Sequence, residues 1–188
     1  MLSLEHMILV CYLIILSIIL FSAYIIYSLC QWGIPNNISA TYYYFERTRK
    51  HYGLFFPIDL LVCCAIVIPI WIYTCQIVSP WASHFSMCPY LTCLCMIIVG
   101  ITSRYKRSRK LTYIHYTAAI IGAAITGIWL LIACYKISFI GLSVVLISVM
   151  AGCFTRTLKK CYLFWLEIAA FYALFFVLFI INFFPVCV

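Results

Sequence analysis

The chain has 188 residues, of which 68% are hydrophobic and only 9% are charged. Soluble domains carry about 25% charged residues, so this composition excludes a water-soluble globular domain and a disordered chain. The net charge is +8, from twelve Lys and Arg against four Asp and Glu. Because these cations fall between apolar stretches, they indicate the positive-inside pattern of membrane proteins, and no nucleic-acid partner is expected.

Apolar stretches recur along the chain and predict an all-α polytopic membrane protein. We expect a six-transmembrane-helix bundle that forms one integral membrane domain over residues 1–188. The first stretch has no Lys or Arg before it and is longer than the core of a signal peptide, so it is interpreted as a membrane helix. The predicted spans are about 7–29, 54–75, 86–101, 113–134, 137–154 and 162–184.

The loop after the first span contains signals for a new short helix. Pro35 blocks continuation of the first helix, and Asn37 or Ser39 can cap another one. We favour an amphipathic helix that lies on the inner leaflet. The alternative is a lid or partner surface over polar groups of the bundle, to which Ser39 and Thr41 would add hydroxyls. The apolar side of this helix would carry Ile38, Tyr42 and Phe45.

The distribution of cations predicts the orientation. The first, third and fifth loops hold eleven of the twelve Lys and Arg, and the exception is Lys136. These loops are therefore expected in the cytoplasm, with the N- and C-termini on the non-cytoplasmic side. The third loop has the densest cluster, which we expect to fix the topology and to contact anionic lipid headgroups: Arg104, Lys106, Arg107, Arg109 and Lys110.

Small residues recur at intervals of four in the fourth span, at Ala119, Ala123 and Gly127. Such a row lets two helices approach closely, which predicts a central place for this span. The alternative is that alanine and glycine are simply common in membrane helices. Cys75 and Cys88 flank the second loop, where they could form a disulfide or remain free thiols.

Ionisable residues inside the predicted spans are the candidate site. Asp59, His115 and Glu167 share a layer roughly 3–8 Å below the cytoplasmic boundary, from a rise of 1.5 Å per residue. They could bind a divalent metal ion and activate water, or relay a proton or ion. The third interpretation is structural, because acids near helix N-termini are favoured by the helix dipole and can pair with loop cations.

Two stretches, IPNNISATYY at residues 34–43 and IHY at residues 114–116, resemble uncharacterised small multi-spanning proteins of gut bacteria and their phages. A more distant similarity is to the alkaline-ceramidase and progestin-receptor-like membrane hydrolases. That resemblance implies a Ser, an Asp and histidines near one membrane face, matched here in order by Ser39, Asp59 and His115. The family holds its zinc with a histidine cluster, whereas this chain has one histidine within its predicted spans.

Three functions follow from these observations. We favour a non-enzymatic accessory or small transport-related subunit of a bacterial inner membrane, with no cofactor and with a membrane-protein partner or a second copy of itself. The first alternative is a metal-assisted intramembrane hydrolase at the cytoplasmic face. Its candidate catalytic residues are Ser39, Asp59, His115 and Glu167, the last three also being metal-ligand candidates. The second alternative is a small channel or ion-coupled carrier.

Overall fold

The computed structural model describes residues 4–49, 51–78, 84–154 and 161–184. Every regular element in these ranges is helical, which confirms the predicted all-α class. The long helices are α1 (Leu4–Trp32), α3 (Phe55–Ile77), α5 (Met87–Ile101), α6 (Arg109–Ala133), α7 (Tyr135–Phe154) and α8 (Tyr162–Phe183). The short elements are the 3-10 turns η1 (Ile38–Ala40), η2 (Tyr52–Leu54) and η3 (Tyr105–Arg107), and the helix α2 (Thr41–Thr48).

Four helices in the described part of the chain are long and apolar enough to cross a membrane. They are α1 from Glu5, the stretch Tyr52–Ile77 that contains α3, then α6 and α8. Met87–Ile101 and Tyr135–Ile147 are apolar but shorter. The chain is therefore a helical membrane protein, and its exposed surface is rich in large apolar side chains such as Tyr12, Ile19, Ile26, Ile120 and Ile128.

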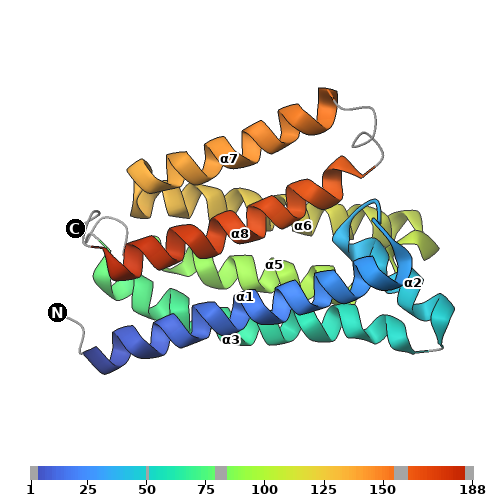
Figure 1. Cartoon of the computed structure of the whole chain (residues 1–188), viewed down its shortest axis with the longest axis horizontal. Coiled ribbons are helices and arrows are strands. Elements are labelled where there is room, and N and C mark those ends of the chain that lie inside the picture. The colour runs from blue at the N-terminus through green and yellow to red at the C-terminus, as the bar shows by residue number, and fades with distance from the viewer. Residues whose placement is uncertain (1–3, 50, 79–83, 155–160, 185–188) are drawn as a thin grey trace.

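The helices lie side by side as a bundle (Figure 1). Helix α1 begins and α8 ends at one end of this bundle, and the connection from α1 to α3 lies at the other end (Figure 1). Helix α3 packs against α1, α5 and α8, whereas α6 packs mainly against α5 and α7. The central helix is therefore α3, and the expectation that the fourth predicted span would be central is wrong.

The core has two parts along the bundle axis. In the larger part, Trp71 of α3 meets Trp129 of α6 edge to face, with ring centroids 4.8 Å apart. The smaller part lies under the first connection and joins Phe21, Phe56 and Phe164 to the connection itself through Ile38 and other residues. The first connection is thus part of the hydrophobic core.

Helix α6 begins at Arg109, four residues before the predicted start at 113, because Ser108 caps it. The Ser108 hydroxyl accepts the Leu111 N–H at 3.4 Å. At the other end, a tight turn at Cys134 joins α6 to α7, as predicted within a residue or two.

Cys75 and Cys88 are free thiols, so the disulfide considered for them is absent from the structure.

The close helix contact of α6 does not use the predicted row of small residues. A Cβ at Gly127 would meet no atom within 4 Å, and Ala123 is exposed. The close approach is at Gly122, where a Cβ would stand 3.0 Å from the Cβ of Cys95 on α5. The buried face of α6 therefore carries His115, Ala118, Gly122 and Trp129.

This difference between the two glycines predicts their response to substitution. Gly122→Val should lower the free energy of unfolding by about 1–3 kcal/mol, because the new side chain has to displace Cys95. Gly127→Val, the matched control, should change it by about 0.5 kcal/mol or less. Reversible unfolding of the purified chain in mixed detergent micelles measures both values, and equal losses at the two positions would contradict the packing described here.

Candidate functional site

The candidate site is built on the turn that follows α1. Gly33 has φ 74°, a left-handed conformation that glycine adopts without strain, and it ends α1 with its N–H bonded to the Leu29 carbonyl at 2.9 Å. Asn37 then caps η1, its side-chain oxygen accepting the Ala40 N–H at 2.7 Å. This confirms Asn37 as a cap, and the helix that follows is α2.

The turn and α2 are packed into the end of the bundle. The side chains of Asn37, Ser39 and Thr41 are 4%, 6% and 0% exposed, and Ile38, Tyr42 and Phe45 are equally buried. The prediction that these three apolar residues share one side is confirmed, but that side contacts protein. The apolar side of this helix therefore packs on the bundle, as expected for the alternative of a lid or partner surface over the bundle.

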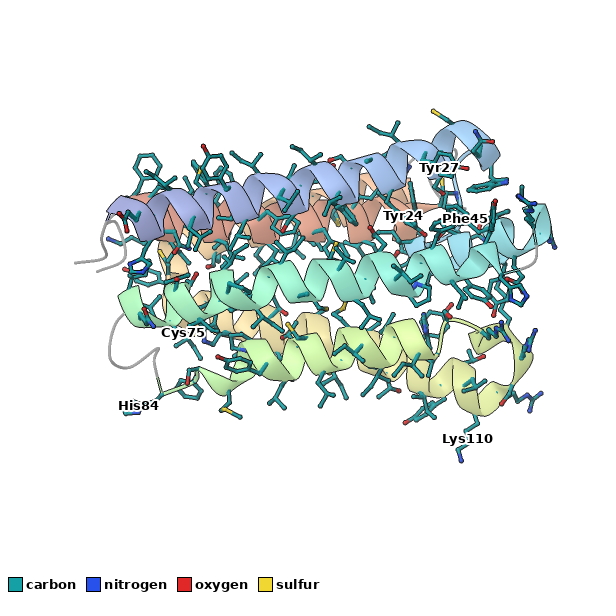
Figure 2. The ribbon with its side chains drawn as sticks, turned by 90° about the horizontal axis from the view of Figure 1, so that it is seen from below. Tyr24, Tyr27, Phe45, Cys75, His84 and Lys110 are labelled. Carbon is teal, nitrogen blue, oxygen red and sulfur yellow. The ribbon has the colours of Figure 1, made fainter. Side chains whose placement is uncertain are left out.

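Aromatic rings fix α2 to the end of α1. The ring of Phe45 lies 4.4 Å from Trp32 and 5.8 Å from both Tyr24 and Tyr27, centroid to centroid. Figure 2 shows these labelled α1 tyrosines and Phe45 gathered at the same end of the molecule. The hydroxyl of Tyr24 also hydrogen-bonds that of Thr41 at the start of α2. These contacts hold the turn in place beside the polar side chains described next.

His115 stands between two hydroxyls inside this end of the bundle. Its Nε2 is 3.1 Å from the Ser39 Oγ, and its Nδ1 is 3.1 Å from the Thr102 Oγ1. Thr102 also donates its only hydroxyl hydrogen to the Ile98 carbonyl at 2.6 Å. Ser39 likewise donates to the Asn37 side-chain oxygen at 3.3 Å, so both hydroxyls that face the His115 ring also bond elsewhere in the protein.

Glu167 of α8 binds the same turn through the backbone. Its carboxylate accepts the N–H of Ile38 at 2.5 Å. The Ile38 carbonyl is in turn an acceptor for the Thr41 hydroxyl at 2.6 Å. On the α6 side, the Asn37 amide donates to the Tyr116 hydroxyl at 3.4 Å. The five residues Asn37–Thr41 thus form hydrogen bonds to α1, α6 and α8.

Asp59 lies elsewhere, on the wall of a small cavity between the helices. This cavity has a volume of about 60 Å³ and is bordered mostly by apolar side chains, including Phe21, Ile38, Trp71 and Phe171. In the part of the chain that the structure describes, no hydrogen bond joins Asp59 to His115 or Glu167. Ile38 lies between Asp59 and Glu167, because its side chain borders the cavity and its N–H binds the Glu167 carboxylate.

The metal-ligand set that was considered as an alternative is not assembled in the described residues. Within the described ranges, no group of three or more His, Cys, Asp and Glu is placed to hold a metal ion. His115 directs both ring nitrogens at hydroxyl groups. Of the four candidates, the structure brings Ser39 and His115 into contact and places Glu167 one residue away along the turn, at Ile38.

Two tyrosines of α2 bind the third connection, a contact that the sequence analysis missed. The Arg104 Nε donates to the Tyr42 hydroxyl, and the Lys106 N–H donates to the Tyr43 hydroxyl at 2.7 Å. Burial raises the pKa of Tyr43. Arg104, expected as a lipid anchor, is therefore bound to protein. The run of three tyrosines at residues 42–44 was the available signal.

Comparison with protein-family models, with curated proteins and with solved structures gave no match to this chain.

The Ser39–His115 contact can be tested as an energetic coupling. In a double-mutant cycle of Ser39→Ala and His115→Ala, we expect a coupling free energy of about 1 kcal/mol, measured by unfolding in micelles. The control cycle combines Ser39→Ala with Thr126→Val, whose hydroxyl bonds Thr92 at 3.0 Å deeper in the bundle. That cycle should be additive within about 0.5 kcal/mol. Additivity in both cycles would contradict the contact.

Proposed function

We propose that this chain is a non-enzymatic integral membrane protein, an accessory or small transport-related subunit, whose first connection closes the cytoplasmic end of the bundle. The observation that carries this proposal is the burial and hydrogen bonding of the candidate nucleophile, Ser39, and the candidate base, His115. Ser39 and His115 are 6% and 2% exposed, and both are hydrogen-bonded within the protein. A substrate would have to displace the turn to reach them, and that turn is part of the core.

The cavity between the helices also favours an accessory role over a channel or carrier. Its volume is only about 60 Å³. Asp59 is the ionisable carboxyl on its wall, and aromatic and aliphatic side chains make up most of the rest. A conducting path needs a row of polar groups across the membrane.

We further propose that six helices cross a bacterial inner membrane, with both termini outside the cytoplasm. The first and third connections support this topology, because they touch through Arg104 and Tyr42 and so lie at one end of the bundle. Cys134, in the turn after α6, is disulfide-bonded. Since disulfides persist in oxidising compartments, that turn fits the non-cytoplasmic side. The exposed apolar faces leave room for lipid and for a membrane-protein partner or a second copy.

Reporter fusions test this topology. Fusions after Lys50, Arg107 and Lys159 should all report the cytoplasm, because the cation-rich connections are retained there. A fusion within the turn at Cys134 serves as the opposite-side control and should report the periplasm. If the fusion after Arg107 reports the periplasm, α5 does not cross and the six-span topology is wrong.

A serine hydrolase is the second candidate, and one observation favours it. The Ser39 Oγ lies 3.1 Å from the His115 Nε2, which is the pairing of a nucleophile with a general base. In such a reaction the Ser39 oxygen would add to an acyl carbon while His115 takes the hydroxyl proton. His115 would then return this proton to the departing alcohol or amine as its bond to the acyl carbon breaks. The metal-assisted version lacks a comparable ligand set in the described ranges.

A fluorophosphonate probe separates the two candidates. Under the accessory function, the chain in native membranes should show no His115-dependent labelling at Ser39, because the hydroxyl is buried. The variants Ser39→Ala and His115→Ala are the controls for labelling at other hydroxyls. Labelling at Ser39 that His115→Ala abolishes would overturn the accessory proposal and establish an activated serine.

A further inference from the structure

A shallow groove runs along one face of α6 from its cation-rich start. It encloses about 490 Å³ and is lined by Lys106, Ser108, Arg109, Thr112, Tyr113, Tyr116, Thr117 and Ile120. From Arg109 to Ile120 the face extends about 16 Å along the helix, at 1.5 Å per residue. This is a substantial part of the roughly 30 Å that a bilayer core measures.

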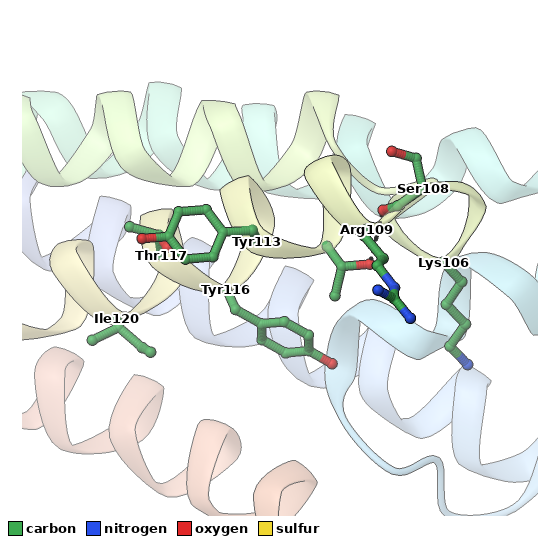
Figure 3. Close-up of a pocket in the computed structure, with 8 residues that line it drawn as sticks. Lys106, Ser108, Arg109, Tyr113, Tyr116, Thr117 and Ile120 are labelled. Atoms are coloured by element: carbon green, nitrogen blue, oxygen red, sulfur yellow. Dashed lines mark hydrogen bonds between the residues drawn. The ribbon is translucent and has the colours of Figure 1, made fainter.

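The groove changes chemistry along its length. Figure 3 shows Lys106 and Arg109 at one end and Ile120 at the other, with the ring of Tyr116 between them. Three hydroxyl side chains, Ser108, Thr112 and Thr117, follow the same face. The last lining residue, Ile120, is aliphatic and 68% exposed. Positive charge, then hydroxyls, then aliphatic surface is the order in which an anionic phospholipid presents its phosphate, its glycerol and its acyl chains.

We propose that this groove is a binding site for one anionic diacyl phospholipid. Its phosphate would lie at Lys106 and Arg109, and an acyl chain would follow Tyr113 and Ile120 toward the middle of the membrane. Arg offers several N–H donors to phosphate oxygens, and Lys offers a compact charge. The groove is distinct from the Ser39 and His115 pair, because its lining contains neither residue.

The positive charge of the groove favours an anionic lipid as its occupant over a second copy of this cationic chain. The whole chain has four acids, of which Glu167 binds the Ile38 N–H and Asp59 borders the cavity between the helices. A second copy could offer this groove few carboxylates and would bring twelve Lys and Arg with it. An anionic leaflet supplies phosphates at the depth where Lys106 and Arg109 begin the helix face.

The groove also touches the turn that closes the bundle. The Tyr116 hydroxyl, which lines the groove, accepts a hydrogen bond from the Asn37 amide. Asn37 in turn caps η1 next to Ser39. A phosphate held beside Tyr116 would therefore stabilise the closed turn, so binding of the lipid should raise the temperature at which the protein unfolds.

Native mass spectrometry of the detergent-purified full chain tests the site. Phosphatidylglycerol should bind with a Kd about 25-fold weaker in the double variant Lys106→Gln/Arg109→Gln, at about fivefold for each cation near a membrane surface. Lys136→Gln is the matched control, because Lys136 lies 6.0 Å from the Tyr135 ring centroid much as Lys106 lies 4.8 Å from that of Tyr43. Its Kd should stay within about twofold of the unaltered chain.

Two further ligands identify what is recognised. Phosphatidylcholine should bind more weakly than phosphatidylglycerol and should be insensitive to the double variant. Free sn-glycerol-3-phosphate should give no shift in unfolding temperature at concentrations where the lipid does. The proposal is overturned if Lys136→Gln weakens phosphatidylglycerol as much as the double variant, if the double variant binds normally, or if glycerol phosphate alone reproduces the shift. If the double variant does not fold, the Kd of phosphatidylglycerol is measured with Arg109→Gln alone, because Arg109 is exposed.

Discussion

The fold at the end of the bundle that carries the first connection depends on one requirement, that a buried backbone turn must have its N–H groups bonded. A helix satisfies its own amides, but the turn between α1 and α2 cannot do so fully, and an unbonded amide buried away from water costs several kcal/mol. The Glu167 carboxylate removes that cost for Ile38, and the Asn37 side chain removes it for Ala40. Because these acceptors are fixed, Ser39 is presented to His115 and α8 is held against the turn.

Much of this turn could be predicted from the sequence because its signals are local. Pro35 and Asn37 act within a few residues of themselves, and the spacing of Ile38, Tyr42 and Phe45 places them on one side of a helix whatever surrounds it. What that side packs against is not a local property. Lipid and a protein core are equally apolar, so the same amphipathic pattern suits a leaflet and a bundle end. The aromatic residues Tyr24 and Trp32, which decide between them, belong to another helix.

The candidate site was predicted from the depth of its residues along the helices. Which side chains meet also depends on how each helix is rotated about its axis. Asp59, His115 and Glu167 were correctly grouped near one end, but each residue along a helix also turns by about 100°, and nothing local sets the rotation of one helix against the next. His115 faces Thr102 and Ser39, Glu167 faces the turn and Asp59 faces the cavity. The rotation of α6 about its axis also could not be predicted. For this reason the close contact with α5 is made by Gly122, one position from the predicted row at Ala123.

The bond between Ile38 and Glu167 joins residues 129 positions apart, and this separation has a consequence for biosynthesis. A ribosome completes the turn after α1 long before it makes the helix that supplies the acceptor. During that interval His115, 76 positions after Ser39, can already hold the Ser39 hydroxyl, while the Ile38 amide still lacks its carboxylate. The bond between Ile38 and Glu167 can therefore form only after α8 has been made. A chain truncated before α8 would leave its turn incompletely bonded, which is the kind of defect that membrane quality control can recognise.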